Sequence, residues 1–382
     1  MKTKTFGMRP LDCLANIPAA VRPDHEFCFF LHDRMVALLQ EYEDSGVHRW
    51  VGDGLAKAAQ LEGHEGPLDV LDMLKKAGLT EAGKHLLISH LILALTSDLL
   101  HFVYEGLRGL EKRKFAIAFS LLRKPFKENM LFLAWLLGDP EDFLARFEKD
   151  NYTSLNGVKP ERRRELLNLA AQKLATKDAF DAELIDQMVF SKEAGNGFEP
   201  LWQKATHLIT SQGANLKTED LNINFIFNNA GSDHLYYAVY DKLPYLMLFL
   251  VQLALRTFSE IAYGNIATTN HLVLISLGTY ECLTGAKQGP LSKQVLKAMR
   301  PMLTCLHCDK PFRFDRENVM SMYLIEQAYC RPCGLASEIP LYWLLAKSNI
   351  KVIPDGYPTA FDKLMQEMKA GTDDSGTTKL AS

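Results

Sequence analysis

Two C-x-x-C pairs near the end of this 382-residue chain constrain its fold more than any other feature. Cys305 and Cys308 form C-L-H-C, and Cys330 and Cys333 form C-R-P-C. Two such pairs are typical of a tetrahedral zinc site, because each tight loop turns two sulfurs toward one point. Four thiolates fill the coordination shell and leave no position for water or substrate. The spacing therefore predicts structural Zn²⁺, whose binding energy helps to fold the local segment.

Other uses of these cysteines are two disulfides, four free thiols or a redox motif. A thioredoxin-like motif needs a single C-x-x-C in a βαβ setting, which is not visible here. His307 lies inside the first pair and could replace a thiol, but with four thiols present we expect it to be a bystander.

Residues 300–345, which contain both pairs, resemble the zinc-ribbon and treble-clef modules of many nucleic-acid-binding and interaction proteins. The resemblance implies a small metal-organised unit with a binding role. Residues 318–328 fit a short helix as well as part of a hairpin, so the choice between ribbon and treble clef stays open.

Composition and charge place the chain among ordinary soluble proteins. The net charge of −3 gives no global basic field toward nucleic acid or membrane. No signal peptide is visible, and the most apolar run, 243–255, is too short to span a bilayer, so we expect no membrane association. Cys13, Cys28 and Cys282 are scattered, which favours a reducing cytoplasm.

Apolar residues recur at helical spacing along most of the chain, and βαβ alternation is absent. We predict a mainly α protein, a multi-helix bundle with a small C-terminal four-cysteine zinc-binding module. The expected segments are an N-terminal helical region (1–66), a helical bundle domain (67–299), the zinc module (300–345), a C-terminal segment (346–370) and a disordered tail (371–382).

Individual helices follow from the apolar pattern and its interruptions. Residues 27–42, 80–110, 161–172, 182–190, 243–263 and 270–283 are the clearest. A helical stretch over 115–137 contains Pro125, which should kink or split it. We also predict a short helix over 67–77 and a lone strand over 222–227.

Polar residues on one face of the helix over 80–110 are the candidates for catalysis. His90, His101 and Glu105 are separated by steps that place them on one side, together with Ser97, Asp98 and Arg108. Two histidines and two acids on or near one face could bind metal or transfer protons. The alternative is the solvated side of an amphipathic helix, since the apolar residues occupy the opposite face. His25, Cys28 and His32 have ligand-like spacing too, and fit a helix flank equally well.

The helical hairpin over residues 80–150 resembles HEPN-like bacterial proteins, some of which are ribonucleases or defence components. Active members carry an arginine and a histidine separated by four to six residues. Arg300 and His307 have such a spacing, but they lie at the first cysteine pair, outside the resembling hairpin. The resemblance therefore gives no support for nuclease activity.

Basic and aromatic residues alternate just after the first cysteine pair. Lys310, Phe312, Arg313, Phe314 and Arg316 could contact phosphates and stack on bases. The alternative is a solvated face with two core phenylalanines.

No P-loop, G-x-G-x-x-G after a strand, G-x-S-x-G or H-E-x-x-H motif occurs in the chain. We therefore expect a zinc-stabilised helical scaffold that contacts nucleic acid or a protein partner, in bacterial defence or a mobile element. The alternatives are an HEPN-like hydrolase or nuclease at the polar helix face, or a structural subunit that oligomerises through apolar helices. The sequence does not determine the oligomeric state.

Overall fold

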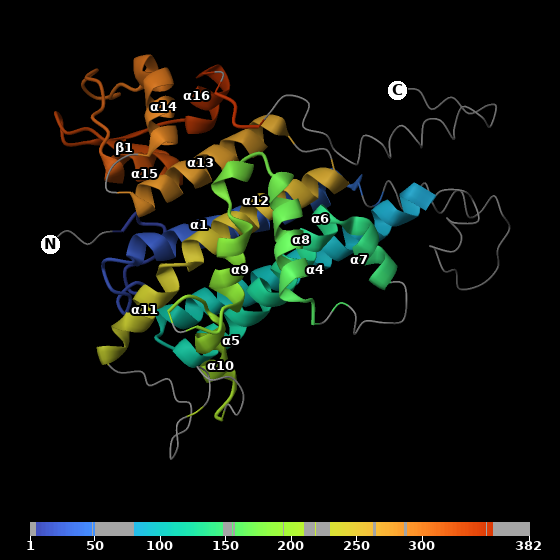
Figure 1. Cartoon of the computed structure of the whole chain (residues 1–382). Coiled ribbons are helices and arrows are strands. Elements are labelled where there is room, and N and C mark those ends of the chain that lie inside the picture. Colours follow the sequence, from blue (N-terminus) through green and yellow to red (C-terminus); the bar gives the residue numbers. More distant parts are fainter. Residues whose placement is uncertain are drawn as a thin grey trace, which may run out of the picture.

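The computed structural model describes residues 5–47, 49, 80–147, 155, 157–193, 195–209, 218, 230–262, 265–285, 289–348 and 350–353. It has a mainly α fold with a small four-cysteine unit toward the C-terminal end, as predicted (Figure 1). The helix predicted over 67–77 and the strand predicted over 222–227 lie outside these residues.

The first half of the fold is helical throughout the described part. Its helices are α1 (Arg22–Ser45), α4 (Thr80–Glu111), α5 (Phe115–Lys124), α6 (Met130–Gly138), α7 (Pro140–Phe147), α8 (Pro160–Gln172), α9 (Ala182–Phe190) and α10 (Glu199–Thr206). A short 3₁₀ turn, Lys177–Ala179, precedes α9.

The second half carries the core helices and the cysteine unit. It consists of α11 (Asp233–Tyr240), α12 (Leu243–Ile261), α13 (Ile266–Thr284), α14 (Pro290–Met299), α15 (Arg316–Ile325), β1 (Gln327–Tyr329), β2 (Ala336–Glu338) and α16 (Leu341–Ser348). The 3₁₀ turns Ala230–Ser232 and Arg300–Met302 precede α11 and follow α14. β1 and β2 form an antiparallel pair.

Pro125 interrupts the predicted long helix as a π-helical turn, Pro125–Asn129, between α5 and α6. Proline has no N–H and its ring clashes with the carbonyl four residues earlier, so the regular α pattern cannot pass through it. The wider π turn absorbs the mismatch without ending the helix.

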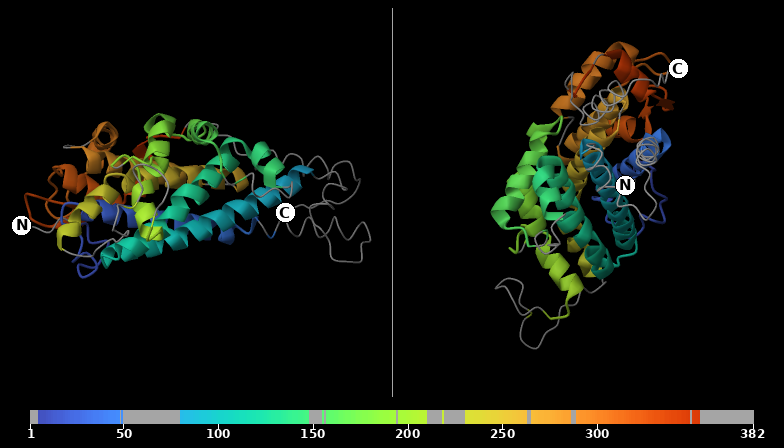
Figure 2. Two further views of the ribbon diagram at one scale, coloured as in Figure 1. Left: turned by 60° about the horizontal axis from the view of Figure 1, so that its bottom comes forward. Right: turned by 90° about the vertical axis from the view of Figure 1, so that its right-hand side faces the viewer.

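Helix α12 lies in the centre of the body, with α1, α4, α6 and α13 packed around it (Figures 1 and 2). Nearly all its side chains are buried, because the segment is apolar around its whole circumference. Its polar residues are satisfied: Gln252 Nε2 donates to Ser276 Oγ at 3.2 Å, and Arg256 Nε donates to the Lys173 carbonyl at 3.2 Å. The run over 243–255 is thus core within one chain, and is not available as an oligomer interface.

One cluster of buried apolar residues extends from Leu14 to Ile353. Helix α1 packs on α12 and α4, so helices on both sides of the predicted boundary at residue 66 share a core. The five-segment division stays a prediction from the sequence.

A buried carboxylate joins the N-terminal arm to the end of α4. Glu111 is fully buried and accepts from Arg9 Nη2 at 2.8 Å and Arg108 Nη1 at 2.9 Å. His25 Nε2 lies 3.4 Å from the same carboxylate, and its Nδ1 contacts the Tyr240 hydroxyl. The charge is therefore compensated inside the fold.

Candidate metal centre

The four predicted cysteines converge on one point. Their sulfur atoms all lie within 4.8 Å of one another. The sulfurs of Cys305 and Cys333 are 3.6 Å apart, and those of Cys308 and Cys330 are 3.7 Å apart. A tetrahedron with Zn–S bonds of about 2.3 Å has edges of about 3.8 Å. The residues therefore fit a four-thiolate zinc site, and the close pairs join the two loops to each other.

The two cysteine loops share one backbone pattern. In the first loop the N–H of Asp309 donates to the Cys305 carbonyl at 2.9 Å, and the Cys305 N–H donates to the Lys310 carbonyl at 2.9 Å. In the second loop the N–H of Gly334 donates to the Cys330 carbonyl at 2.8 Å. The Cys330 N–H donates to the Leu335 carbonyl, also at 2.8 Å. Each loop is thus a closed turn that presents two sulfurs on one side.

Short antiparallel pairings hold the base of each loop. A bridge between Thr304 and Pro311 closes the first, and the β1–β2 pair closes the second. Helix α15 lies between the two loops in sequence. Of the segment 318–328, for which the sequence left a helix or part of a hairpin open, residues 318–325 belong to α15 and residues 327–328 to β1. We call the unit from Arg300 to Glu338 the cysteine module.

His307 takes no place in the sulfur cluster. Its Nε2 lies 3.3 Å from the Ala336 carbonyl oxygen, a hydrogen-bond acceptor. The cluster found among the described residues consists of the four cysteines alone, which agrees with a bystander role for this histidine.

The thiols differ in how readily they ionise. Burial raises the pKa of Cys305, but the Ser337 hydroxyl and the backbone N–H groups of His307 and Cys308 donate to its sulfur and lower the pKa to about 6. A backbone N–H lowers the pKa of Cys330, yet burial and the neighbouring thiols raise it to about 12. Successive thiolates repel one another, and a bound divalent cation removes that repulsion.

The module packs against α13 through α15. The Tyr323 ring lies over Gly278, so closely that a Cβ on Gly278 would fall 2.5 Å from it. The Tyr323 hydroxyl donates to Ser292 Oγ at 3.3 Å. Arg316 Nη2 donates to the Leu283 carbonyl at 2.7 Å. These contacts place the module on the helical body.

The predicted phosphate and base contacts divide into two groups. Lys310 and Arg313 are exposed. Phe312 and Phe314 are half-buried, with ring centroids 5.8 Å apart, and pack against the apolar core. Arg316 holds the Leu283 carbonyl at the first position of α15. Two of the five residues thus face solvent fully.

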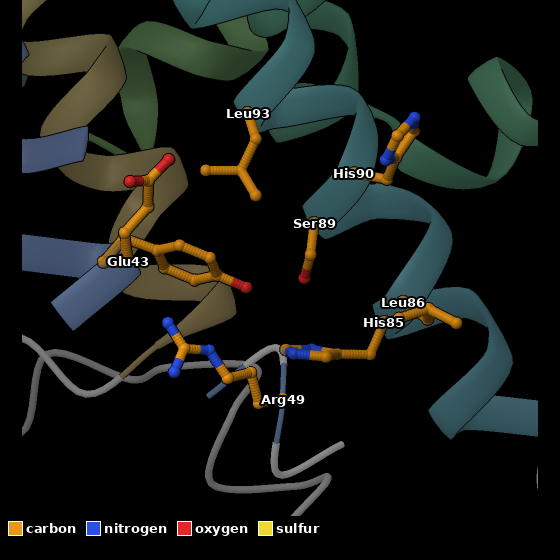
Figure 3. A pocket seen from close by; sticks show the side chains of 8 residues that line it. Glu43, Arg49, His85, Leu86, Ser89, His90 and Leu93 are labelled. Atoms are coloured by element: carbon orange, nitrogen blue, oxygen red, sulfur yellow. The ribbon is translucent and has the colours of Figure 1, made fainter. Parts of the chain in front are cut away.

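The polar face of α4 does not assemble into a site. His101 and Glu105 are exposed, and Asp98 is engaged by Lys124 and Asn129, at 2.8 and 2.9 Å. His90 borders a cavity of about 310 Å³ with Arg49, His85 and Ser89. Figure 3 shows the His90 ring directed away from the His85 and Ser89 side chains. The predicted group therefore reads as the solvated side of an amphipathic helix.

His25, Cys28 and His32 do not share a metal site either. His25 belongs to the Glu111 cluster, Cys28 is fully buried, and His32 Nδ1 lies 2.9 Å from Asp33. Burial lowers the pKa of His25.

Sequence reasoning missed a larger cavity beside the cysteine module. About 740 Å³ lies between the module and the start of α1, bordered by Asp24, Arg316, Tyr329 and Arg331. Arg331 stands inside the second C-x-x-C and could have been noticed. Asp24 could not, because it approaches the module only through the tertiary fold.

Two helical stretches, Gly83–Glu111 and Asp233–Ile261, are long and apolar enough to cross a membrane by length and composition. The second contains α12, and 89% of its most apolar window is buried, against 33% for the first. Core helices pass the same test, so this is weak evidence, and the expected absence of membrane association stays a prediction.

The chain is mainly helical and carries a four-cysteine cluster with the geometry of a zinc site. No protein-family model, curated protein or solved structure matches it.

Proposed function

We propose that this protein is a zinc-stabilised helical binding protein whose cysteine module, with the adjoining α16, docks on a protein partner. The supporting observation is the exposure of large apolar side chains there. Met302, Leu306, Tyr329, Leu335 and Trp343 are between 36% and 74% exposed. Apolar side chains that gather on a surface commonly mark interaction sites.

The zinc site has a clear role in this proposal. Leu306, inside the first cysteine loop, is 74% exposed, so the loop does not fold by burying its own apolar residue. Metal binding supplies folding free energy in its place. The exposed leucine is then held ready for a partner, and burying it contributes roughly 25 cal/mol for each Å² of apolar surface. A reducing compartment such as the cytoplasm suits the site, because the ligands must remain thiolates.

The test is site-specific photo-crosslinking in the native host. A benzophenone amino acid replaces Leu306 or Trp343, and Ile117 on α5, which is 54% exposed, serves as the matched control. We expect one discrete crosslinked protein from the first two positions and none from the control. Equal products from all three positions, or none at Leu306 and Trp343, would contradict the proposal.

Two single substitutions separate partner binding from folding. Leu306→Ser and Trp343→Ser remove exposed apolar surface without touching a metal ligand. We expect both to lose the crosslinked partner while keeping zinc content and helicity. Loss of zinc in either variant would instead indicate a folding role for that side chain.

A second candidate is contact with nucleic-acid phosphates. Lys310 and Arg313 support it, since both are exposed and neither forms an ion pair with any residue that the structure describes. Binding to single- and double-stranded nucleic acid over a salt series tests this version. It requires weaker binding as salt rises and a loss in Lys310→Glu plus Arg313→Glu. Unchanged binding in that variant, or none at low salt, would exclude it.

A further inference from the structure

A cleft of about 740 Å³ lies between the cysteine module and the start of α1. Thr5, Phe6, Pro23 and Asp24 line it from the body, near the start of α1, and residues of α15 line it from the module. It is larger than the cavity of about 310 Å³ beside α4. Its volume lies in the usual range for small organic ligands, about 300–1,000 Å³.

One face of α15 forms a long wall of this cleft. Tyr323 lies on the opposite face of α15, which packs against α13. Met320, Ser321 and Ile325 line the cleft. A helix of 10 residues extends about 15 Å. Phe6 and Pro23 line the cleft from the body, so it has an apolar part beside its charged and polar lining.

Three acidic residues lie at the other end of the cleft, and each is at the start of a helix. Asp24 lies in the first turn of α1, and Glu317 in the first turn of α15. Asp315 is the N-cap of α15 and accepts from the Asn318 N–H at 2.9 Å. Acidic side chains stabilise the positive end of a helix, which accounts for Asp315 and Glu317 without a ligand. At Asp24 the cost of burial outweighs this effect and raises the pKa of the carboxyl.

Arg316 has no such explanation. It is the first residue of α15, where a cation opposes the helix dipole. Its Nη2 holds the Leu283 carbonyl, while its buried Nε has no hydrogen-bond partner. Asp24 faces Arg316 across the cleft and interacts with its charge, yet no ion pair joins them among the described residues. A residue that breaks a local rule commonly has a compensating role. The Leu283 hydrogen bond, which helps to place the module on the body, is one such role, and Arg316 also borders the cleft.

Arg331 adds a second guanidinium at this end. Its side chain is 58% exposed, and Nη2 donates to Asp315 at 2.5 Å. The beginnings of α1 and α15 both border the cleft and contribute positive helix ends. Guanidinium groups recognise carboxylate and phosphate in a planar, two-point manner.

We infer that this cleft binds a small amphipathic organic anion, with its carboxylate or phosphate head at Arg316 and Arg331 and its apolar body along Met320, Ile325 and Phe6. The site adjoins the partner surface proposed above, and Tyr329 borders both. It uses the wall of the module that faces the body, and it needs no change in the cysteine cluster.

The test is calorimetric titration of the full zinc-loaded chain with four probes that share one alkyl chain: octanoate, octyl phosphate, octylammonium and octanol. We expect saturable binding of the two anions, at least tenfold tighter than that of the cation or the alcohol. The ratio between octanoate and octyl phosphate then identifies the preferred head. Equal binding of octylammonium, or no saturable binding of either anion, would overturn the inference.

Two variants and a control locate the binding. Arg316→Gln should weaken anion binding at least tenfold, while Arg300→Gln, at an exposed arginine of the same module outside the cleft lining, should change it less than twofold. Ser321→Trp fills the cleft and leaves both arginines in place. Ser321→Trp should abolish binding, and it therefore tests the inference if Arg316→Gln does not fold. Normal binding by a folded Ser321→Trp protein would place the ligand elsewhere.

Discussion

Asp309 and Gly334 occupy equivalent positions in the two cysteine loops. Each follows the second cysteine of its pair, and each donates its N–H to the carbonyl of the first cysteine, at 2.9 and 2.8 Å. Both have left-handed backbone conformations, with φ of 55° and 76°. The turn geometry requires this conformation, which glycine adopts freely and which asparagine and aspartate tolerate better than other residues.

We therefore expect opposite effects from substitutions at these two positions. Gly334→Ala should destabilise the zinc-bound module by about 1–2 kcal/mol, because alanine is strained at this φ. Asp309→Gly should be neutral or slightly stabilising. Competition with a zinc chelator measures both. A Gly334→Ala protein with unchanged zinc affinity would show that the second loop does not need the left-handed turn.

The metal itself gives the most direct prediction. The purified protein should contain about one zinc per chain, and cobalt should give the absorption of a tetrahedral thiolate site. Cys305→Ser plus Cys330→Ser should lose both signals, with faster amide exchange confined to the cysteine module. Cys13→Ser, outside the cluster, is the control and should keep the metal. Metal-free protein prepared under reducing, zinc-containing conditions would refute the site.

The contact between Gly278 and Tyr323 should decide whether the module stays on the body. Alanine normally favours a helix interior over glycine by about 1 kcal/mol. At Gly278 the added methyl would meet the Tyr323 ring at 2.5 Å, so we expect Gly278→Ala to destabilise instead. Tyr323→Leu in the same chain should recover part of the loss. Thermal unfolding monitors both, and a stabilised Gly278→Ala single variant would contradict this packing.

Asp24 should make stability depend on pH. Burial raises its pKa from 3.8 to about 6, although its own backbone N–H and Arg316 lower it. The folded chain then keeps this proton over a range where the unfolded chain has lost it. Stability should fall as pH rises from about 4 to 6, by at most about 3 kcal/mol, and level off above. The neighbouring Cys28, Tyr240 and Tyr280 have raised pKa values and stay neutral in this range.

Asp24→Asn separates this contribution from all others. The variant should be more stable than the parent above pH 6. Its free energy of unfolding, measured with urea, should lose the part of its pH dependence that Asp24 causes. Asp178→Asn, at an exposed acid, should leave that pH dependence as it is.

Glu111 should be one of the most sensitive polar positions in the fold. Glu111→Gln would leave Arg9, Arg108 and His25 facing a neutral amide in a buried site. Breaking a fully buried ion pair costs about 3–5 kcal/mol. We expect about 1–3 kcal/mol here, because the Arg9 and Arg108 side chains are 18% and 36% exposed and stay partly solvated. Glu105→Gln, on the exposed side of the same helix, should change stability by less than about 0.5 kcal/mol. Chemical denaturation compares the two, and equal stabilities would show that the buried cluster contributes little.

Local sequence rules predicted the parts of the molecule that depend on near neighbours. The helix over 182–190 has the observed bounds, and Pro125 marks the observed change from α to π geometry. The four cysteine ligands were found for the same reason. A C-x-x-C loop brings its two sulfurs together through backbone hydrogen bonds within a few residues.

The surface residues show the limit of such rules. Alternating basic and aromatic residues after the first loop left two interpretations open, a stacking and phosphate-binding group or a solvated face with two core phenylalanines. In the fold, Phe312 and Phe314 pack inward, and Arg316 turns to the Leu283 carbonyl. Which side of a short irregular segment faces solvent depends on what packs against it, and periodicity carries no information on that.

The sequence by itself determined a mainly helical chain and the set of thiols that can hold a zinc ion, because helical periodicity and C-x-x-C spacing are local properties. Only the tertiary structure decided that Tyr323 of α15 packs on Gly278 and that the other face of α15 lies toward the start of α1. That packing brings Asp24 and Arg316 to one cleft, although about three quarters of the chain separates them in sequence. The cause is packing between distant segments, which depends on the shapes of both surfaces at once.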